Sequence, residues 1–448
     1  KGNTFIGVPP ENERWSLDGQ KVYFEWNPNN ELGTSTYFWK NGLSKPELAS
    51  PNDVAFSKLD FKKTSNPDLH YYIDKGSLFS YALKSKTSKK LYQQSSPISN
   101  LQMGAVPGIL YFRQNENLFQ FNTNEGSVIQ ITNFRKGKAE DKPADKESFL
   151  KSQQEELFQF IRDQEALKKW NLAKSKTIKS DFPKPYFYGK NNFGSLKVDP
   201  KGNFATFRLI EDSERKNEKM EVFITADGYN QIEDTKAKVS TDNLLASKFG
   251  VYDIAKDSVY FVNFSSLSHI QDVPKYSELY EKSKTTEKKD KLIVVQEPIY
   301  NENGSYAIAE IRSQDNKDRW IVSLNLKKGT FQELDHQHDE AWIGGPGIPS
   351  YSFGRGTLGF LGDNETVYFQ SEETGYSHLY TYNLKSKKKI QLTKGNWEVR
   401  NVNLSKDKKS FYLTTTTTHP GNRDFYKLEV ANAVLQPILT KDGAHEVS

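Results

Sequence analysis

TVYFQSEETGYSHLYTYNLKSKKKIQLTKGNWEV, residues 366–399, reads as three β-strands in succession. The predicted strands are rich in aromatic and β-branched residues, and polar or Gly-containing turns separate them. They cover residues 366–370, 379–384 and 390–392. A short meander of this kind cannot bury its own faces, so it must stack on further sheets. We therefore expect the rest of the chain to contain repeats of this unit.

Seven other stretches show the same order of a polar turn, an apolar strand and an aromatic-rich strand. They lie at residues 15–48, 69–92, 109–132, 195–224, 251–264, 299–329 and 401–439. Their spacing of roughly 40 to 60 residues is typical of β-propeller blades. We predict an all-β fold, an eight-bladed β-propeller (seven to eight blades), over residues 1–448. Residues 443–448 are analogous to 396–399, so we expect the chain to stop part-way into another unit.

The repeats are interrupted at residues 136–190. A charged, Pro-containing run at 136–147 precedes a segment, 148–170, whose apolar residues recur at helical spacing. These apolar residues are Leu150, Leu157, Phe158 and Ile161. The spacing predicts one amphipathic helix inserted between the third and fourth units.

Composition excludes several classes of protein. Aromatic residues make up 13% of the chain, which fits many short strands and does not fit disorder. The formal charge of +5 is small for 448 residues and does not indicate a nucleic-acid partner. Cysteine is absent, which excludes disulfides, thiolate metal sites and a cysteine nucleophile. No apolar run is long enough to span a membrane, and no signal-like segment follows Lys1, so we expect the chain to begin after a processing site or an artificial boundary.

Several runs of residues carry a resemblance to a known family. SEETGYSHLYTYNL at 371–384, followed by LTKGNWEV at 392–399, resembles the N-terminal propeller of dipeptidyl peptidase IV-like serine peptidases. These peptidases belong to the prolyl oligopeptidase family, and the similarity is to members from Bacteroidetes-type bacteria. Supporting runs are DRW at 318–320, EAWIGG at 340–345 and HPGNR at 419–423. The close resemblance covers about residues 300–448.

The resemblance implies an eight-bladed propeller followed by an α/β-hydrolase domain, whose nucleophilic Ser lies in a G-x-S-x-G motif. This chain has no such motif, since GYSHL at 375–379 lacks the last Gly. We therefore expect no catalytic residue, no hydrolase domain and no peptidase activity in the chain alone. The expected role is to gate substrate access and to help bind the N-terminal side of a peptide. The expected partners are the peptide substrate, the protein's own hydrolase domain and a second copy in a homodimer.

Further expectations concern location and the peptide-binding residues. The resemblance implies a periplasmic or secreted dipeptidyl- or oligopeptidase. In the family, a Glu pair on a short helical insertion holds the free α-amine of the substrate by charge-assisted hydrogen bonds. The inserted helix here carries Glu155 and Glu156, which are candidates for this role, although an ordinary solvated helix face is the alternative. Trp342 either lines the cavity near the substrate or packs between blades.

The family motif also suggests residues that brace neighbouring blades: Glu372, Glu373, Gly375, Tyr376, His378 and Trp397. For the two glutamates, a solvent-facing turn is the alternative. His336 and His338 alternate on a predicted strand and would point the same way, as metal ligands could. No further ligand group is identifiable, so we predict no metal site and no cofactor.

Two other functions remain open at this point. A free-standing propeller could bind a protein or a glycan as a recognition module. A metal- or sugar-active propeller enzyme is the third alternative, but no spacing of the carboxylates singles out a catalytic pair. The coding sequence downstream of Ser448 would separate a peptidase domain from a stand-alone module.

Overall fold

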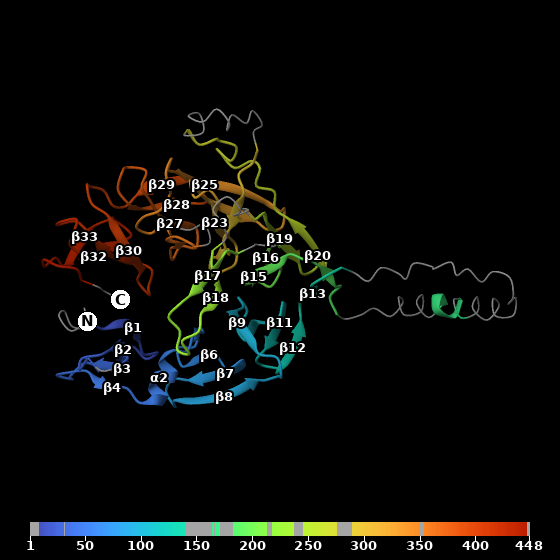
Figure 1. Ribbon diagram of the computed structural model, residues 1–448, viewed down its shortest axis with the longest axis horizontal. Helices are drawn as coiled ribbons and strands as arrows, with labels where there is room; N and C mark the ends of the chain where they lie inside the picture. Colours follow the sequence, from blue (N-terminus) through green and yellow to red (C-terminus); the bar gives the residue numbers. More distant parts are fainter. Residues whose placement is uncertain are drawn as a thin grey trace.

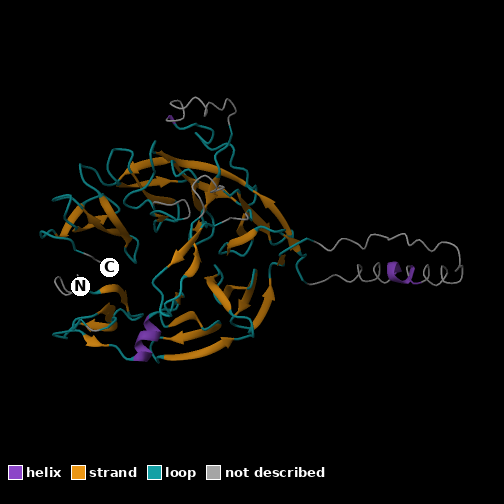
Figure 2. Ribbon diagram, in the orientation of Figure 1, coloured by secondary structure: helices purple, strands orange, loops and turns teal. Residues whose placement is uncertain are grey.

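The computed structural model describes residues 9–30, 32–138, 164, 166–170, 182–212, 217–236, 245–275, 289–349 and 354–445. In these residues, six four-stranded sheets and one five-stranded sheet follow one another around a ring (Figures 1 and 2). The predicted all-β propeller is therefore confirmed, and the described residues form seven blades.

The first three blades use strands that are consecutive in the sequence. Blade 1 contains β1 (Glu11–Trp15), β2 (Lys21–Trp26), β3 (Ser35–Lys40) and β4 (Glu47–Leu48). Blade 2 contains β5 (Lys62–Lys63), β6 (Leu69–Asp74), β7 (Ser77–Ala82) and β8 (Thr87–Tyr92). Blade 3 contains β9 (Ile98–Met103), β10 (Ile109–Gln114), β11 (Asn117–Asn122) and β12 (Ser127–Gln130).

A short helix, α2 (Pro51–Ser57), lies between blades 1 and 2 (Figure 2). Its start follows from the local sequence: the hydroxyl of Ser50 accepts the N–H of Asp53 at 3.2 Å. Proline in the first turn lacks the N–H that would otherwise be left without a partner there.

Blade 4 corrects the predicted division of the chain. It contains β15 (Asn192–Val198), β16 (Phe204–Ile210), β19 (Ser247–Asp253) and β20 (Ser258–Phe261). The predicted fourth and fifth units are one sheet, because β16 and β19 pair continuously from Phe204↔Asp253 to Ile210↔Ser247. The strand predicted at 220–224 belongs instead to a separate hairpin of β17 (Lys219–Val222) and β18 (Gln231–Asp234). The segment does form a strand, as its composition predicted, but it pairs with β18 and not with a strand of blade 4.

The last three blades follow the predicted units closely. Blade 5 contains β21 (Ile293–Val295), β22 (Ile299–Tyr300), β23 (Ala307–Ser313), β24 (Asp318–Asn325) and β25 (Thr330–His338). Blade 6 contains β26 (Leu358–Phe360), β27 (Thr366–Ser371), β28 (His378–Asn383) and β29 (Lys388–Gln391). Blade 7 contains β30 (Val399–Leu404), β31 (Ser410–Thr415), β32 (Asp424–Glu429) and β33 (Leu435–Leu439). The three strands predicted within 366–399 are confirmed, and β26 is an additional first strand.

The hydrophobic core lies between blades. Trp320 of blade 5 has no exposed surface and packs with Phe249 and Phe264 in the blade 4 part of the same cluster. On the other side of blade 5, Ile321 packs with Phe369 of blade 6. Since one sheet face cannot be buried within its own blade, packing between blades supplies most of the hydrophobic stabilisation.

The two ends of the 136–190 insertion lie together. β13 (Phe134–Arg135) and β14 (Tyr186–Phe187) form a parallel pair. Gly137 and Gly189 then exchange two backbone hydrogen bonds, at 2.9 and 3.0 Å. Between these ends, residues 164 and 166–170 are helical. The rest of the helix predicted at 148–170 lies outside the described residues.

Candidate functional site

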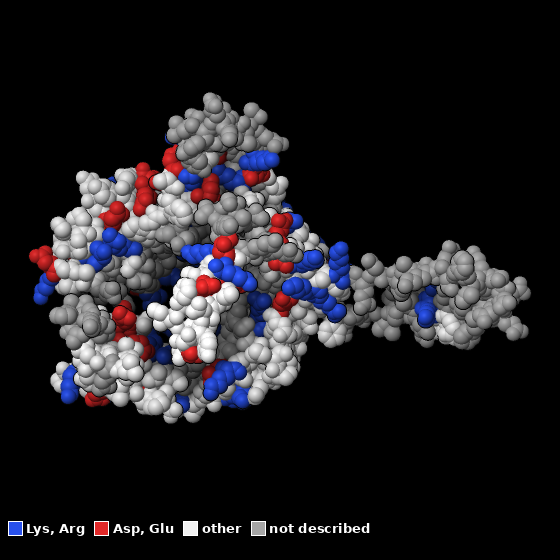
Figure 3. All heavy atoms as spheres, in the orientation of Figure 1, with Lys and Arg blue, Asp and Glu red and all other residues white. Residues whose placement is uncertain are grey.

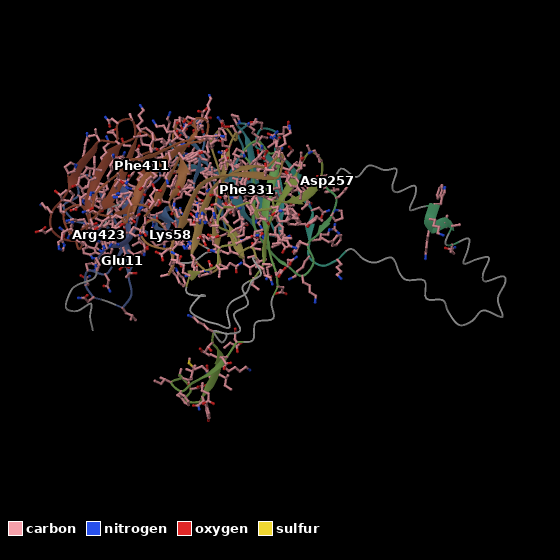
Figure 4. All side chains as sticks on the ribbon, turned by 90° about the horizontal axis from the view of Figure 1, so that it is seen from above. Glu11, Lys58, Asp257, Phe331, Phe411 and Arg423 are labelled. Carbon is pink, nitrogen blue, oxygen red and sulfur yellow. The ribbon has the colours of Figure 1, made fainter. Side chains whose placement is uncertain are left out.

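One face of the ring carries the large excursions from the blades. In each antiparallel blade, the turn between the second and third strands and the link to the next blade lie on the same face. We call this the insertion face; it carries the β17–β18 hairpin, the 339–349 loop, the 372–377 turn and the 416–423 turn. In Figure 4, Glu11 and Arg423 lie on the side from which this hairpin projects, while Phe411 lies nearer the other side. Figure 3 shows a central hollow on the insertion face, with the hairpin in front of it.

The 339–349 loop is pinned from beneath by a buried arginine. Arg312 of β23 has no exposed surface. Its Nη2 donates to the carbonyl of Ile343 at 2.8 Å, and its Nη1 donates to the carbonyl of Pro349 at 3.0 Å. Burial lowers the pKa of Arg312, while Glu310 opposes that change. One side chain thus fixes two points of the loop, six residues apart.

Trp342 lies on this pinned loop with its side chain 49% exposed. The ammonium group of Lys317 donates to the carbonyl of Ala341 at 3.1 Å, directly before Trp342. The backbone N–H of Trp342 donates to the carboxylate of Asp339 at 2.8 Å. The loop therefore presents a large aromatic side chain on the insertion face from a backbone that is held in place.

A second buried arginine joins blade 5 to blade 6. Arg319 Nη2 donates to Glu310 Oε2 at 2.9 Å, and neither side chain has exposed surface. Arg319 Nη1 donates to the side chain of Gln337 at 3.1 Å and to the backbone carbonyl of Gln370 at 2.7 Å. Because Gln370 belongs to β27, this network fixes how the two blades meet beneath the 339–349 loop.

The Gly-Pro-Gly part of the loop rests on the side chain of Gln370. Its Nε2 donates to the carbonyls of Pro346, at 3.3 Å, and Val399, at 2.7 Å. The Ser377 hydroxyl also donates to the Pro346 carbonyl, at 2.8 Å. A Cβ on Gly347, where φ is +74°, would lie 2.0 Å from Gln370 Oε1. The approach of loop to strand therefore requires glycine at this position.

Three carboxylates lie near one another beside this loop. The pKa of Glu372 is raised, chiefly because its carboxylate is buried and also because Glu398 and Asp339 carry negative charge nearby. A Cβ on Gly345 would lie 2.4 Å from Glu372 Oε1, so this glutamate reaches the loop backbone. Glu398 already accepts the N–H of Ser377 at 2.7 Å. The negative charge of the three carboxylates therefore favours the binding of a cation beside this loop.

Glu373 lies in the same turn but has a different environment. Its carboxylate pairs with the ammonium group of Lys389, which also pairs with Asp335 of blade 5. Asp335 and Glu373 raise the pKa of Lys389 although burial opposes this. Lys389 thus links blades 5 and 6 through two carboxylates.

The remaining residues of the family motif meet where blade 6 leads into blade 7. His378, which is buried, donates from Nε2 to the carbonyl of Gly395 at 2.9 Å and accepts at Nδ1 from the Thr393 hydroxyl at 3.0 Å. The ring of Trp397 meets His378 edge-on, with centroids 5.1 Å apart. In the 372–377 turn, Gly375 has φ +92° and Tyr376 is 37% exposed.

The structure brings only some predicted site residues together. Trp342 and Glu372 both lie on the insertion face, where Glu372 reaches Gly345 of the loop that carries Trp342, whereas Glu155 and Glu156 lie outside the described residues. Sequence reasoning missed Arg312, Arg319 and Gln370 as residues that hold the site. The DRW run at 318–320 could have predicted the role of Arg319, because a charged residue in a buried strand must have a specific partner.

His336 and His338 share one carboxylate. His336 Nε2 and His338 Nδ1 lie 2.9 and 2.8 Å from the same oxygen of Asp318. Among the residues described, no group of three or more His, Cys, Asp or Glu side chains is arranged to hold a metal ion. No described helix is both long and apolar enough to cross a bilayer.

Comparison with known proteins bears directly on this part of the chain. Residues 248–448 match the family described as the dipeptidyl peptidase IV (DPP IV) N-terminal region. These 201 residues are similar to that N-terminal region. The region includes blades 5 to 7, the 339–349 loop and the 372–377 turn.

Two relatives that match part of this chain are fungal proteins. Dipeptidyl peptidase 4 of Arthroderma otae is 38% identical over 121 residues, which are 26% of this chain and 15% of that protein. Dipeptidyl peptidase 4 of Trichophyton rubrum is 34% identical over 128 residues, which are 28% of this chain and 16% of that protein.

Two solved structures share the fold of nearly the whole chain. Dipeptidyl peptidase 4 of Porphyromonas gingivalis aligns with 99% of this chain and 55% of its own, with a TM-score of 0.56 and 11% identity. A putative dipeptidyl aminopeptidase IV of Bacteroides ovatus aligns with 96% of this chain and 54% of its own, with a TM-score of 0.52 and 13% identity. This chain thus spans about half the length of either solved structure.

Proposed function

We propose that this propeller is the non-catalytic, substrate-gating domain of a prolyl oligopeptidase-family serine peptidase. In this proposal it controls access to a hydrolase domain and contacts the N-terminal side of a peptide. The observation that carries the proposal is the match of residues 248–448 to the dipeptidyl peptidase IV N-terminal region. The insertion face supports it, because the large excursions and the central hollow lie there (Figure 3).

Trp342 and the neighbouring carboxylates are the proposed peptide contacts. A held aromatic ring can pack on peptide side chains at little cost in conformational entropy. Asp339, Glu372 and Glu398 create a negative field that suits a free α-ammonium group. Glu155 and Glu156 remain proposed contacts of the same kind.

Peptide binding tests this role. We would titrate the chain with a short peptide that has a free N-terminus and with its N-acetylated form, using NMR or calorimetry. We expect the free amine to bind more tightly, and Trp342→Ala to weaken binding by about tenfold, the loss of roughly 1.4 kcal/mol. Trp15→Ala is the matched control, because Trp15 is 57% exposed but ends β1 at the opposite face. Equal effects of the two substitutions would argue against the site.

We further propose that the chain alone does not hydrolyse peptides. It lacks a G-x-S-x-G motif, so the nucleophile would belong to another domain. A fluorophosphonate probe should leave residues 1–448 unlabelled, while a polypeptide that includes the hydrolase domain should be labelled at one serine. Stoichiometric labelling of the chain alone would contradict the proposal.

The β17–β18 hairpin is the proposed contact with that hydrolase domain. Its apolar side chains are exposed: Met220 by 53%, Phe223 by 68%, Ile224 by 95%, Tyr229 by 76% and Ile232 by 66%. A two-stranded hairpin is marginally stable alone, and five exposed apolar side chains on one hairpin indicate a binding partner. Because the hairpin projects from the insertion face (Figure 4), the hydrolase domain is its proposed occupant.

Solution mass distinguishes this occupant from a second copy of the chain. If the hydrolase domain is the occupant, the chain should be monomeric both with and without the substitutions Ile224→Asp and Tyr229→Ser, and these should weaken its association with a separately added hydrolase domain. A wild-type dimer that the double variant converts to monomer would instead support the homodimer.

Three finer expectations also remain proposals. An eighth blade is supported by the resemblance of 443–447 to 395–399 and by the parallel bridge between Arg423 and Ala444. A structure of a longer polypeptide would test it.

Periplasmic or secreted location is supported by the family resemblance, and cell fractionation would test it. The bracing role of Glu372, Glu373, Gly375, Tyr376, His378 and Trp397 is supported by the His378–Trp397 contact and the Glu373–Lys389 pair.

A further inference from the structure

Three rings stack where the link from blade 4 meets blade 5. His269, in a turn of this link, lies over His336 of β25, with ring centroids 4.8 Å apart and an interplanar angle of 12°. His336 also stacks with Trp320, with ring centroids 5.3 Å apart and an interplanar angle of 22°. His269 has a φ of +58°, a left-handed conformation that only a turn makes acceptable. The turn thus places one imidazole flat against another.

A buried carboxylate faces His336 from β24. Asp318 lies 2.9 Å from His336 Nε2 and 2.8 Å from His338 Nδ1, and it also pairs with the ammonium group of Lys291. Although burial opposes ionisation, hydrogen bonds from His336, Lys291 and His338 hold the pKa of Asp318 at about 2. Asp318 is therefore an anion throughout the range in which histidine titrates.

Other charged groups border the stack. His269 Nδ1 lies 2.6 Å from Asp272 Oδ2, and His338 Nε2 lies 3.4 Å from Glu340 Oε1. Lys275 pairs with Glu340 at 3.3 Å, and Asp315 lies 4.0 Å from Lys291. A cavity of about 650 Å³ adjoins these side chains, so protons reach the rings from solvent.

The residue before His269 is anchored firmly. The N–H and hydroxyl of Ser268 donate to the carboxylate of Glu333 at 2.9 and 2.6 Å. The indole N–H of Trp320 donates to the carbonyl of Ser268 at 2.9 Å. Ile270 is buried in the core, and its carbonyl accepts the N–H of Lys291 at 2.9 Å. Movement of the link is therefore confined to the side chain of His269 and to residues after Ile270.

We propose that the His269–His336 stack is an acid-sensitive latch, which holds the 271–275 segment against blade 5 at neutral pH and releases it when both rings are protonated. Each ring has its own carboxylate, Asp272 or Asp318, to stabilise its cation. Two imidazolium rings in face-to-face contact repel each other. The side chain of His269 is 56% exposed whereas that of His336 is 15% exposed, so the His269 side chain and Asp272 move away together.

Release of the segment by the latch also affects the 339–349 loop. The backbone N–H of Lys275 donates to Glu340 Oε2 at 3.3 Å, and its ammonium group pairs with the same carboxylate. Both contacts join the link to the segment that carries Trp342. Opening of the latch therefore removes one support of this loop, whether or not the loop contacts a peptide.

Hydrogen exchange at the amides of Asp272 and Lys275 tests the latch. The Asp272 N–H donates to the carbonyl of His269 at 3.0 Å and thus reports the turn itself. Between about pH 7.5 and about pH 5.5, and after correction for intrinsic exchange, we expect their protection factors to fall by about tenfold or more. In His269→Asn the fall should disappear. Asn accepts the left-handed φ and can still bond Asp272, but it carries no charge.

Two further variants define the outcome. His419→Asn removes an exposed histidine of the 416–423 turn and should respond as the wild type does. Asp272→Asn keeps both rings but removes the partner of His269, so the transition should move to lower pH. Unchanged wild-type protection at acid pH, or a His269→Asn variant that opens like the wild type, would overturn the proposal.

Discussion

Arg319 and Glu310 form an ion pair of 2.9 Å in which neither side chain has exposed surface. The two residues lie on neighbouring strands of blade 5, and Arg319 reaches on to the backbone of Gln370 in blade 6 at 2.7 Å. Charges removed from water are costly unless paired, so each depends on the other. The pair therefore fixes the geometry between two blades beneath the 339–349 loop.

Removing one partner of this pair should be strongly destabilising. Arg319→Met leaves Glu310 charged and buried, and we expect a loss of about 3 to 5 kcal/mol in the free energy of unfolding. Urea denaturation at neutral pH measures this loss. The double variant Arg319→Met with Glu310→Met should not restore the lost stability, because it leaves the buried guanidinium of Arg312, which lies 3.8 Å from Glu310, without its carboxylate.

The exposed pair Lys385–Glu365, at 3.9 Å, is the matched control. Lys385→Ala should change stability by less than about 1 kcal/mol, because solvent screens surface ion pairs. A similar effect of the surface and buried substitutions would show that Arg319 does not join the blades as described.

Two glycines with positive φ should respond differently to alanine. Gly347 and Gly375 have φ of +74° and +92°, but only at Gly347 would a Cβ collide, 2.0 Å from Gln370 Oε1. Gly375→Ala meets nothing within 4 Å, so it should cost about 1 to 2 kcal/mol from backbone strain alone. Gly347→Ala should add about 1 to 3 kcal/mol for overpacking. Thermal unfolding of both variants compares them, and equal melting temperatures would refute the close contact.

Asp318 should contribute stability that disappears only in strong acid. Its pKa falls from 3.8 to about 2 in the folded chain, so the folded state favours the ionised form. This contribution to the free energy of unfolding is about 2 kcal/mol. It is fully present above the pKa of Asp318 in the unfolded chain, and it is lost as the pH falls through the pKa in the folded chain. We expect the difference in unfolding free energy between wild type and Asp318→Asn to narrow between about pH 4 and about pH 2. A constant difference over that interval would contradict the assignment.

Two tryptophans should separate stability from surface contact. Trp320 has no exposed surface and donates to the Ser268 carbonyl at 2.9 Å, so Trp320→Ala should cost about 3 to 5 kcal/mol. Trp342 is 49% exposed on a loop that other residues hold, so Trp342→Ala should cost less than about 1 kcal/mol. Chemical denaturation of both variants provides the comparison. Severe loss of stability in Trp342→Ala would mean that this residue packs between blades.

Much of each blade could be predicted from local sequence. The Asp199 turn is an example: its carboxylate accepts the N–H groups of Asn203 and Phe204 at 2.7 and 2.6 Å. Because these hydrogen-bond partners are only four and five residues from Asp199, the local sequence is enough to predict the turn. For the same reason, the strands at 366–371, 378–383 and 388–391 follow from alternation and turn residues alone.

The number of blades depended on a pairing that local sequence does not reveal. β16 and β19 lie in one sheet although the β17–β18 hairpin separates them in the sequence. A strand-like segment specifies an extended backbone but not its partner. Two units were therefore predicted where the tertiary structure forms one.

The sequence by itself determined the all-β character, the repeat, the absence of cysteine chemistry and the residues that match the dipeptidyl peptidase IV region. Only the tertiary structure decided which charges are buried together and where Trp342 lies. Arg319 acquires Glu310 and Gln370 as partners because separate strands, in two blades, pack against each other. Burial and long-range contact are properties of the assembled ring, so no local pattern could have specified them.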